Sequence, residues 1–191
     1  YYGTKKGCEP MQLIYNYKDH NVYAVNEGME TKDVTASVKV YDAGSALIYE
    51  DSCVLASSYR NTVKVFDLNR FQGIPHFIAL ELADKEGNII ADNFYCIGAE
   101  PNVYDWKDYT WYHTPVVEYT DLRFAFAQPE ADIEMTVGEK DGKYIVTLVN
   151  RSQVISFMNI LKAKDSSGNL VVPAYWSDNF FPLLPGQTKT V

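Results

Sequence analysis

The chain has 191 residues, of which 47% are hydrophobic. That length accommodates two β-sandwiches of the immunoglobulin type, at about 100 residues each, but not a third. The formal net charge is -8, and the lysines and arginines are scattered rather than clustered, which argues against binding to nucleic-acid phosphates. No apolar run approaches the roughly 20 residues that a membrane-spanning helix needs.

The first half of the chain alternates apolar and polar residues with a period of two, which predicts β-strands. Within residues 34–41, Val34, Ala36, Val38 and Val40 alternate with polar residues or tyrosine, as in a sheet with one buried face. The strands expected here are 11–17, 22–25, 34–41, 47–55, 61–68, 76–83 and 89–97. Such strands with turns every 8–12 residues predict a sandwich over residues 10–98.

The alternation breaks over residues 99–115, where Trp106, Tyr109, Trp111 and Tyr112 crowd an irregular stretch. We interpret this stretch as an aromatic-rich linker. A second sandwich is expected over residues 116–191. Its predicted strands are 121–127, 133–139, 143–150, 154–164, 170–172 and 180–184. No sequence repeat relates the halves, and the best helical candidate is the segment 1–7.

The three cysteines are an odd number without a dense disulfide framework, which favours three free thiols packed as small hydrophobic residues. A bridge between Cys53 and Cys96 across the first sandwich is an alternative, while Cys8 precedes that sandwich. No spacing typical of metal ligands is present, so neither a metal nor a cofactor is expected. The histidines are isolated from one another at His20, His76 and His113. We interpret His76, within an apolar strand, as a packed residue rather than a catalytic base.

Three segments carry a family resemblance: 2–10 (YGTKKGCEP), 105–115 (DWKDYTWYHTP) and 176–187 (WSDNFFPLLPGQ). In this order they resemble the segment that leaves the catalytic barrel, the linker between two C-terminal sandwiches, and the closing motif of the last immunoglobulin-like domain in glycoside hydrolase family 2 enzymes. The enzymes resembled are of the β-mannosidase and exo-β-glucosaminidase type. The three matches span nearly the whole chain.

The resemblance implies an all-β chain of two tandem immunoglobulin-like β-sandwiches, with residues 1–9 as the tail of the barrel-exit segment. It also implies that the catalytic residues, both Glu in that family, lie in a barrel outside this sequence, since such a barrel takes about 250 residues. The family's acid/base Glu follows an Asn. The pair Asn26-Glu27 matches that pattern but lies in a predicted loop, so no catalytic residue is expected here. Four further carboxylates are interpreted as a solvated face: Glu118, Glu130, Asp132 and Glu134.

The linker aromatics have two interpretations. Trp106, Tyr109, Trp111 and Tyr112 could stack on sugar rings, or could anchor a joint between domains. Because each aromatic side chain buries 150–250 Å², a few suffice for such a joint, and we expect Trp106 and Trp111 to be mostly buried there.

The loop of residues 176–179 offers weak candidates for substrate contact in Trp176, Asp178 and Asn179. Asp and Asn are also ordinary turn formers, and Trp176 could instead close the second core. A glycosylation sequon occurs at Asn150-Arg151-Ser152.

The sequence therefore favours the non-catalytic C-terminal part of a retaining β-glycosidase, which supports the barrel of the same chain during cleavage of a β-linked oligosaccharide. The alternatives are a carbohydrate-binding module or adhesion domains of the fibronectin type. The chain opens on Tyr1 rather than Met and is expected to be a piece of a longer protein. A secreted or periplasmic location is expected, with no nucleic-acid partner and no membrane span.

Overall fold

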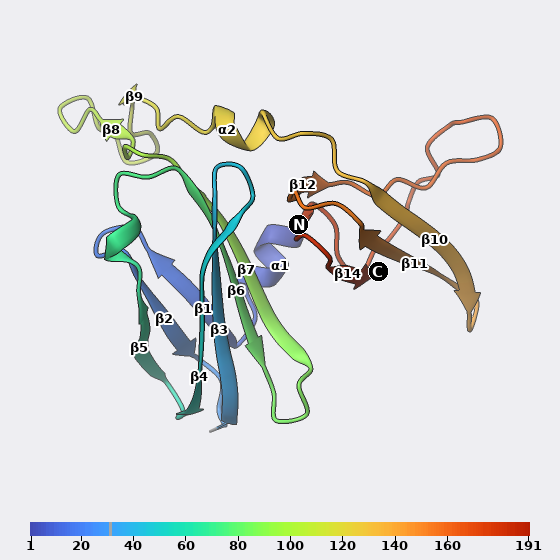
Figure 1. Cartoon of the computed structure of the whole chain (residues 1–191), viewed down its shortest axis with the longest axis horizontal. Helices are drawn as coiled ribbons and strands as arrows, with labels where there is room; N and C mark the ends of the chain where they lie inside the picture. The colour runs from blue at the N-terminus through green and yellow to red at the C-terminus, as the bar shows by residue number, and fades with distance from the viewer. Residues whose placement is uncertain (31) are drawn as a thin grey trace. The chain divides into compact units, whose positions relative to one another are not determined.

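The computed structural model of the chain describes residues 1–30 and 32–191 (Figure 1). These residues form two compact units: an N-terminal unit of Lys6–Ala127, and a C-terminal unit that combines Tyr1–Lys5 with Gln128–Val191. All strand ladders are antiparallel, and the expected all-β class is confirmed. The helices described are short: α1 (Tyr2–Gly7), η1 (Asn69–Phe71) and α2 (Arg123–Phe126). The domain boundaries expected from the sequence, 10–98 and 116–191, stay a prediction.

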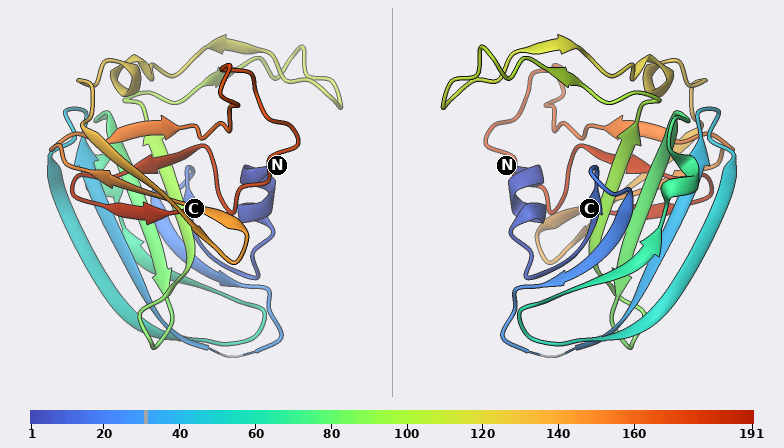
Figure 2. Two further views of the ribbon diagram at one scale, coloured as in Figure 1. Left: turned by 90° about the vertical axis from the view of Figure 1, so that its right-hand side faces the viewer. Right: turned by 90° about the vertical axis from the view of Figure 1, so that its left-hand side faces the viewer.

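The N-terminal unit contains two sheets that Figures 1 and 2 show as two layers. One sheet has the order β1-β2-β5 and the other the order β4-β3-β6-β7. Buried side chains from both sheets form one core, so the unit is a sandwich. The strands are β1 (Met11–Asn16), β2 (Asn21–Asn26), β3 (Lys32–Asp42), β4 (Leu47–Ser57), β5 (Asn61–Asp67), β6 (His76–Ala83) and β7 (Ile89–Ile97).

Strand β3 shows why the period-two prediction holds. Val34, Ala36, Val38 and Val40 are all buried in the core, whereas the polar residues between them are partly exposed. Full burial of a valine side chain contributes about 1.5–3 kcal/mol, which fixes the face that this strand turns inward.

Part of the outer face of the larger sheet, around Phe77, is also covered. Phe77 of β6 is fully buried there, and its ring centroid lies 5.6 Å from that of Phe94 and 5.0 Å from that of Phe124 in α2. The covering segment passes close to Gly98, where an added Cβ would lie 2.1 Å from Thr120 Oγ1. A residue without a side chain at position 98 therefore permits this approach.

The strand expected over 121–127 is wrong, because a short helix, α2, occupies this stretch. The Asp121 carboxylate accepts the backbone N–H of Arg123 at 3.0 Å and also pairs with its guanidinium at 2.6 Å. That side-chain turn starts a helical turn, which directs Phe124 onto Phe77.

Between β7 and α2, residues 103–118 form a two-stranded projection that we call the aromatic arm (Figure 1). Strand β8 (Val103–Tyr104) pairs with β9 (Val116–Glu118). The ladder continues toward the tip through an Asp105–Pro115 backbone hydrogen bond of 2.9 Å and the Thr110–His113 bridge. The stretch that looked irregular in the sequence is thus a ribbon.

The C-terminal unit has a three-stranded sheet, β10-β11-β14, and a two-stranded sheet, β12-β13. Its core holds Val146, Leu148, Phe181, Leu183 and Val191. The strands are β10 (Ile133–Lys140), β11 (Lys143–Asn150), β12 (Ser156–Asn159), β13 (Phe181–Leu183) and β14 (Thr188–Thr190).

Two of the expected strands in this unit are shortened or absent. The stretch 154–164 keeps only β12, which is interrupted by an irregular register and by a positive φ of 57° at Met158. Asn159 there bonds the Ser156 carbonyl at 3.0 Å, a local contact that competes with the ladder. Around 170–172 the structure has an isolated bridge, Lys164–Leu170.

The two units share a local structure that no repeat in the sequence indicated. Asn26 ends β2 and Asn150 ends β11, and each strand is the centre of its three-stranded sheet. Each side-chain oxygen accepts the N–H two residues on, Gly28 at 2.9 Å and Ser152 at 3.0 Å. Each amide nitrogen donates to two carbonyls, one of them four residues later in the chain. For Asn26 these are the carbonyls of Glu30 (2.9 Å) and Ser58 (3.2 Å). For Asn150 they are the carbonyls of Val154 (2.8 Å) and Leu183 (2.9 Å).

We call this arrangement the asparagine corner. Both asparagines are buried, and each amide satisfies backbone groups that are themselves partly or fully shielded from water. The Asn150 nitrogen is the atom to which a glycan would be attached, and the folded unit keeps it inside and donating two hydrogen bonds.

The cysteines Cys8, Cys53 and Cys96 are free; Cys53 and Cys96 are partly buried, but the expectation of a packed side chain is wrong for Cys8, which is exposed. Cys53 lies on β4 and Cys96 on β7, at opposite edges of one four-stranded sheet. Three strand spacings of about 4.8 Å separate those edges, which is well beyond the Cα–Cα reach of a disulfide.

Candidate functional site

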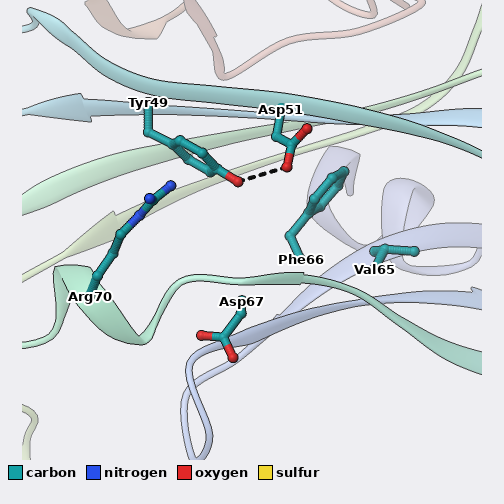
Figure 3. A pocket seen from close by; sticks show the side chains of 6 residues that line it. All are labelled: Tyr49, Asp51, Val65, Phe66, Asp67 and Arg70. Atoms are coloured by element: carbon teal, nitrogen blue, oxygen red, sulfur yellow. Dashed lines mark hydrogen bonds between the residues drawn. The ribbon is translucent and has the colours of Figure 1, made fainter.

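One open pocket of about 390 Å³ lies in the N-terminal unit between β4, β5 and η1 (Figure 3). The Tyr49 hydroxyl donates to the Asp51 carboxylate at 2.9 Å. The Arg70 guanidinium lies over the Tyr49 ring, 3.8 Å from its centroid. The lining residues are Tyr49, Asp51, Val65, Phe66, Asp67 and Arg70.

The charges of this pocket are satisfied by neighbouring groups. Hydrogen bonds from the Asn69 side chain and backbone, together with Lys64, hold the pKa of Asp67 well below its usual range. Burial, followed by the hydrogen bond to Asp51, raises the pKa of Tyr49. A glycosidase acid needs a carboxyl group with a raised pKa, so Asp67 is unsuited to that role.

His76 is buried in β6, as expected of a packed residue. Its Nδ1 donates to the Ile74 carbonyl at 2.6 Å, and its Nε2 has no hydrogen-bond partner among the residues that the structure describes. Burial is the main cause that lowers its pKa. The imidazole is therefore neutral and enclosed, and it is not positioned to exchange protons with a substrate.

The loop of residues 176–179 turns its polar groups toward its own unit. The Asp178 carboxylate pairs with Lys189 Nζ at 2.7 Å, and that ammonium lies 4.8 Å from the centroid of the Phe181 ring. Trp176 is partly buried against the core of the C-terminal unit, in agreement with the interpretation that it closes this core.

Asn179 acts as a substitute for a strand partner. Its side-chain oxygen accepts the N–H of Leu161 at 2.8 Å, and its nitrogen donates to the carbonyl of the same residue at 3.0 Å. The side chain is buried, so the amide serves the backbone. A role for Trp176, Asp178 or Asn179 in substrate contact stays a prediction.

The same loop has partners that sequence reasoning missed. Lys5 Nζ donates to the Ser177 carbonyl at 2.7 Å, and the Tyr2 ring centroid lies 6.2 Å from that of Phe180. The contacts join α1 residues to the loop and to Phe180, which directly follows it, more than 170 positions away, and no pattern in the sequence indicates them.

The aromatic side chains of the arm lie at the surface. Trp106 is 70% exposed, Trp111 87%, Tyr109 55% and Tyr112 74%. The expectation that Trp106 and Trp111 are mostly buried is wrong for this chain, because the arm is a two-stranded ribbon with no second layer of its own. Their role as a joint between domains stays a prediction.

The carboxylates considered for catalysis do not assemble into a pair. Glu27 is exposed and follows the corner residue Asn26, and its backbone N–H bonds the Pro10 carbonyl at 2.8 Å. Glu134 pairs with Arg151 at 2.7 Å on the surface. The other members of the expected solvated face are also exposed: Glu118, Glu130 and Asp132.

Residues 1–30 and 32–191 contain no group of three or more His, Cys, Asp or Glu side chains that could hold a metal ion. No helix among them is long and apolar enough to cross a membrane.

Comparison with known proteins gives consistent matches. Residues 111–191 match the family model of the exo-β-D-glucosaminidase Ig-fold domain. The exo-β-D-glucosaminidase of Arthroderma benhamiae is 32% identical over 195 residues, which covers 98% of this chain and 22% of that protein. The chain thus spans about a fifth of the length of the curated relatives that it matches.

Solved structures give matches to the same kind of enzyme. The exo-chitosanase CsxA of Amycolatopsis orientalis superposes with a TM-score of 0.88 at 25% identity, over 100% of this chain and 24% of that one. The β-D-mannosidase of Dictyoglomus thermophilum has a TM-score of 0.65 at 14% identity, over 100% of this chain and 20% of that one, a likeness of fold alone.

Proposed function

We propose a supporting, non-catalytic role for this chain, which carries the Ig-fold domain of the exo-β-D-glucosaminidases of glycoside hydrolase family 2. In this role its two units buttress the catalytic barrel of a longer protein. The whole protein would remove β-linked glucosamine from the end of an oligosaccharide, with retention at the sugar carbon.

The similarity along the full chain carries this proposal. A match over 98% of this chain that covers only 22% of the relative leaves most of the relative's length, and room for a catalytic barrel, outside it. The chemistry of the described residues supports the same conclusion. The retaining mechanism needs two carboxyl groups about 5–5.5 Å apart, one of them with a raised pKa, and the carboxylates described above are exposed or bonded to neighbours.

The partner in this proposal is the barrel of the same protein, and the substrate of the whole protein is a β-linked amino sugar. Of the two enzyme types that the sequence resembles, the similarity to exo-β-D-glucosaminidases and to an exo-chitosanase favours glucosaminidase over mannosidase. A secreted or periplasmic location fits a polymeric substrate outside the cell, and fractionation of the source cells tests it.

Hydrolysis of an aryl β-D-glucosaminide tests the proposal directly. The purified 191-residue chain should give no turnover, whereas the whole protein should. Removing residues 128–191, the continuous part of the C-terminal unit, from the whole protein should lower its melting temperature. Turnover by the 191-residue chain that disappears in a Glu27→Gln variant would overturn the proposal.

A further inference from the structure

We propose that the aromatic arm is a binding site for a cationic β-glycan, an oligomer of glucosamine. Sugar rings would stack on the exposed aromatic rings, and sugar ammonium groups would pair with carboxylates beside them. This gives the chain a ligand of its own, beyond the supporting role proposed above.

The first argument is the exposure of the rings. Tryptophan and tyrosine normally bury most of their surface, yet two of the three tryptophans of this chain lie on the arm and are more than two-thirds exposed. A group of large aromatic side chains held at the surface marks an interaction site in a folded protein. The remaining tryptophan, Trp176, is partly buried against a core.

The second argument is that the rings are held in place before a ligand arrives. The Asp105 carboxylate accepts the N–H of Lys107 at 2.9 Å and of Asp108 at 3.3 Å, which fixes the turn that bears Trp106. The Trp106 ring centroid lies 5.6 Å from that of Tyr104 and 6.3 Å from that of Tyr109. Binding to a preorganised surface loses less conformational freedom than binding to a loose loop.

The third argument is charge, and it selects the ligand. The arm, residues 103–118, contains one basic residue, Lys107, and a net charge of -2. Its acidic residues are Asp105, Asp108 and Glu118. A neutral glycan would use the rings but not the carboxylates, whereas a glucosamine oligomer carries an apolar sugar face and a positive charge on each unit. Rings interleaved with carboxylates are complementary to that combination.

The test is isothermal titration calorimetry, in which a glucosamine hexamer is added to the 191-residue chain and, separately, to the whole protein. We expect Trp106→Ala and Trp111→Ala each to weaken binding about five- to tenfold, the loss of one stacking contact. Tyr175→Ala, an equally exposed aromatic change in the C-terminal unit, is the matched control and should leave the affinity unchanged. Asp108→Asn should weaken binding, and 0.5 M salt should weaken it further because surface charges are screened.

The N-acetylated hexamer and a glucose hexamer separate charge from stacking. Both should bind at least tenfold more weakly than the glucosamine hexamer. Equal affinity for all three, or loss of affinity in Tyr175→Ala as large as in Trp106→Ala, would overturn the proposal. Circular dichroism confirms that each variant folds.

The alternative to a glycan on the aromatic arm is another protein surface, and one measurement distinguishes the two. Covalent labelling of tryptophan in the whole protein, followed by mass spectrometry, should modify Trp106 and Trp111 freely without glycan and less in its presence. Protection of both indoles in the absence of glycan would show that another part of the protein covers the arm, and the proposal would fall.

Discussion

The asparagine corner of the C-terminal unit should be one of its most sensitive positions. Replacing Asn150 by Ala removes the donors to Val154 and Leu183 and the acceptor for the Ser152 N–H. Three backbone groups then lose their partner: the Leu183 carbonyl in a buried bond, at roughly 1–3 kcal/mol, and the Val154 carbonyl and Ser152 N–H in part-buried bonds, at less than that each. Allowing for relaxation, we expect the free energy of unfolding to fall by about 3 kcal/mol, a large part of the 5–15 kcal/mol typical of a domain.

Tryptophan fluorescence measures this change in the correct unit. With Trp106 and Trp111 replaced by Phe, Trp176 is the sole tryptophan, and it packs against the C-terminal core. Urea unfolding followed at Trp176 then reports this unit. Asn169→Ala, an exposed asparagine of the same unit that bonds Asp165 at 3.2 Å, is the control. If Asn150→Ala unfolds within about 0.5 kcal/mol of that control, the reasoning on buried amide bonds fails.

Other predictions follow from single contacts. Asn179→Ala removes the partner of both backbone groups of Leu161 and should destabilise the C-terminal unit by about 2 kcal/mol in the same urea assay. Gly98→Ala brings a methyl group against Thr120. It should lower the free energy of unfolding of the N-terminal unit by about 1–3 kcal/mol, seen as a lower melting temperature. Gly3→Ala, with open space around it, should not lower the melting temperature. Because burial lowers the pKa of His76, the unfolded chain binds its proton more readily, so stability should be constant above pH 6.5 and decline as the pH falls below it. A His76→Gln variant should lose that part of the decline, and an unchanged pH profile would contradict the assignment.

The strands of the N-terminal unit could be predicted because a sandwich strand has one face in the core. The alternation of Val34, Ala36, Val38 and Val40 has no other simple explanation, and the bounds of β6 and β7 match the prediction at every residue. The stretch 121–127 misled because Leu122, Phe124 and Phe126 also alternate. There the hydrogen bond that the Arg123 N–H donates to the Asp121 carboxylate decides the backbone conformation, and periodicity does not register such a bond.

The asparagine corner could not be predicted from composition. An asparagine at the end of a strand has the same appearance as an ordinary turn former, and only the tertiary structure brings Ser58 to Asn26 and Leu183 to Asn150. A useful signal was present in the shared pairs Val25-Asn26 and Val149-Asn150, each at the end of an apolar strand. Two residues are too few to establish a repeat until the hydrogen bonds are seen.

The contact of Lys5 with Ser177 has a consequence for the order of folding. A ribosome completes Tyr1–Lys5 long before Ser177, and the continuous segment Lys6–Ala127 can close its core before the rest emerges. Tyr2 and Lys5 therefore meet their partners only after the whole N-terminal unit has been translated. Once the N-terminal unit has folded, the flexible chain that must close this contact shortens to the part after Ala127, which reduces the entropy lost on closure. Residues translated before the N-terminal unit thus join the unit that is translated after it.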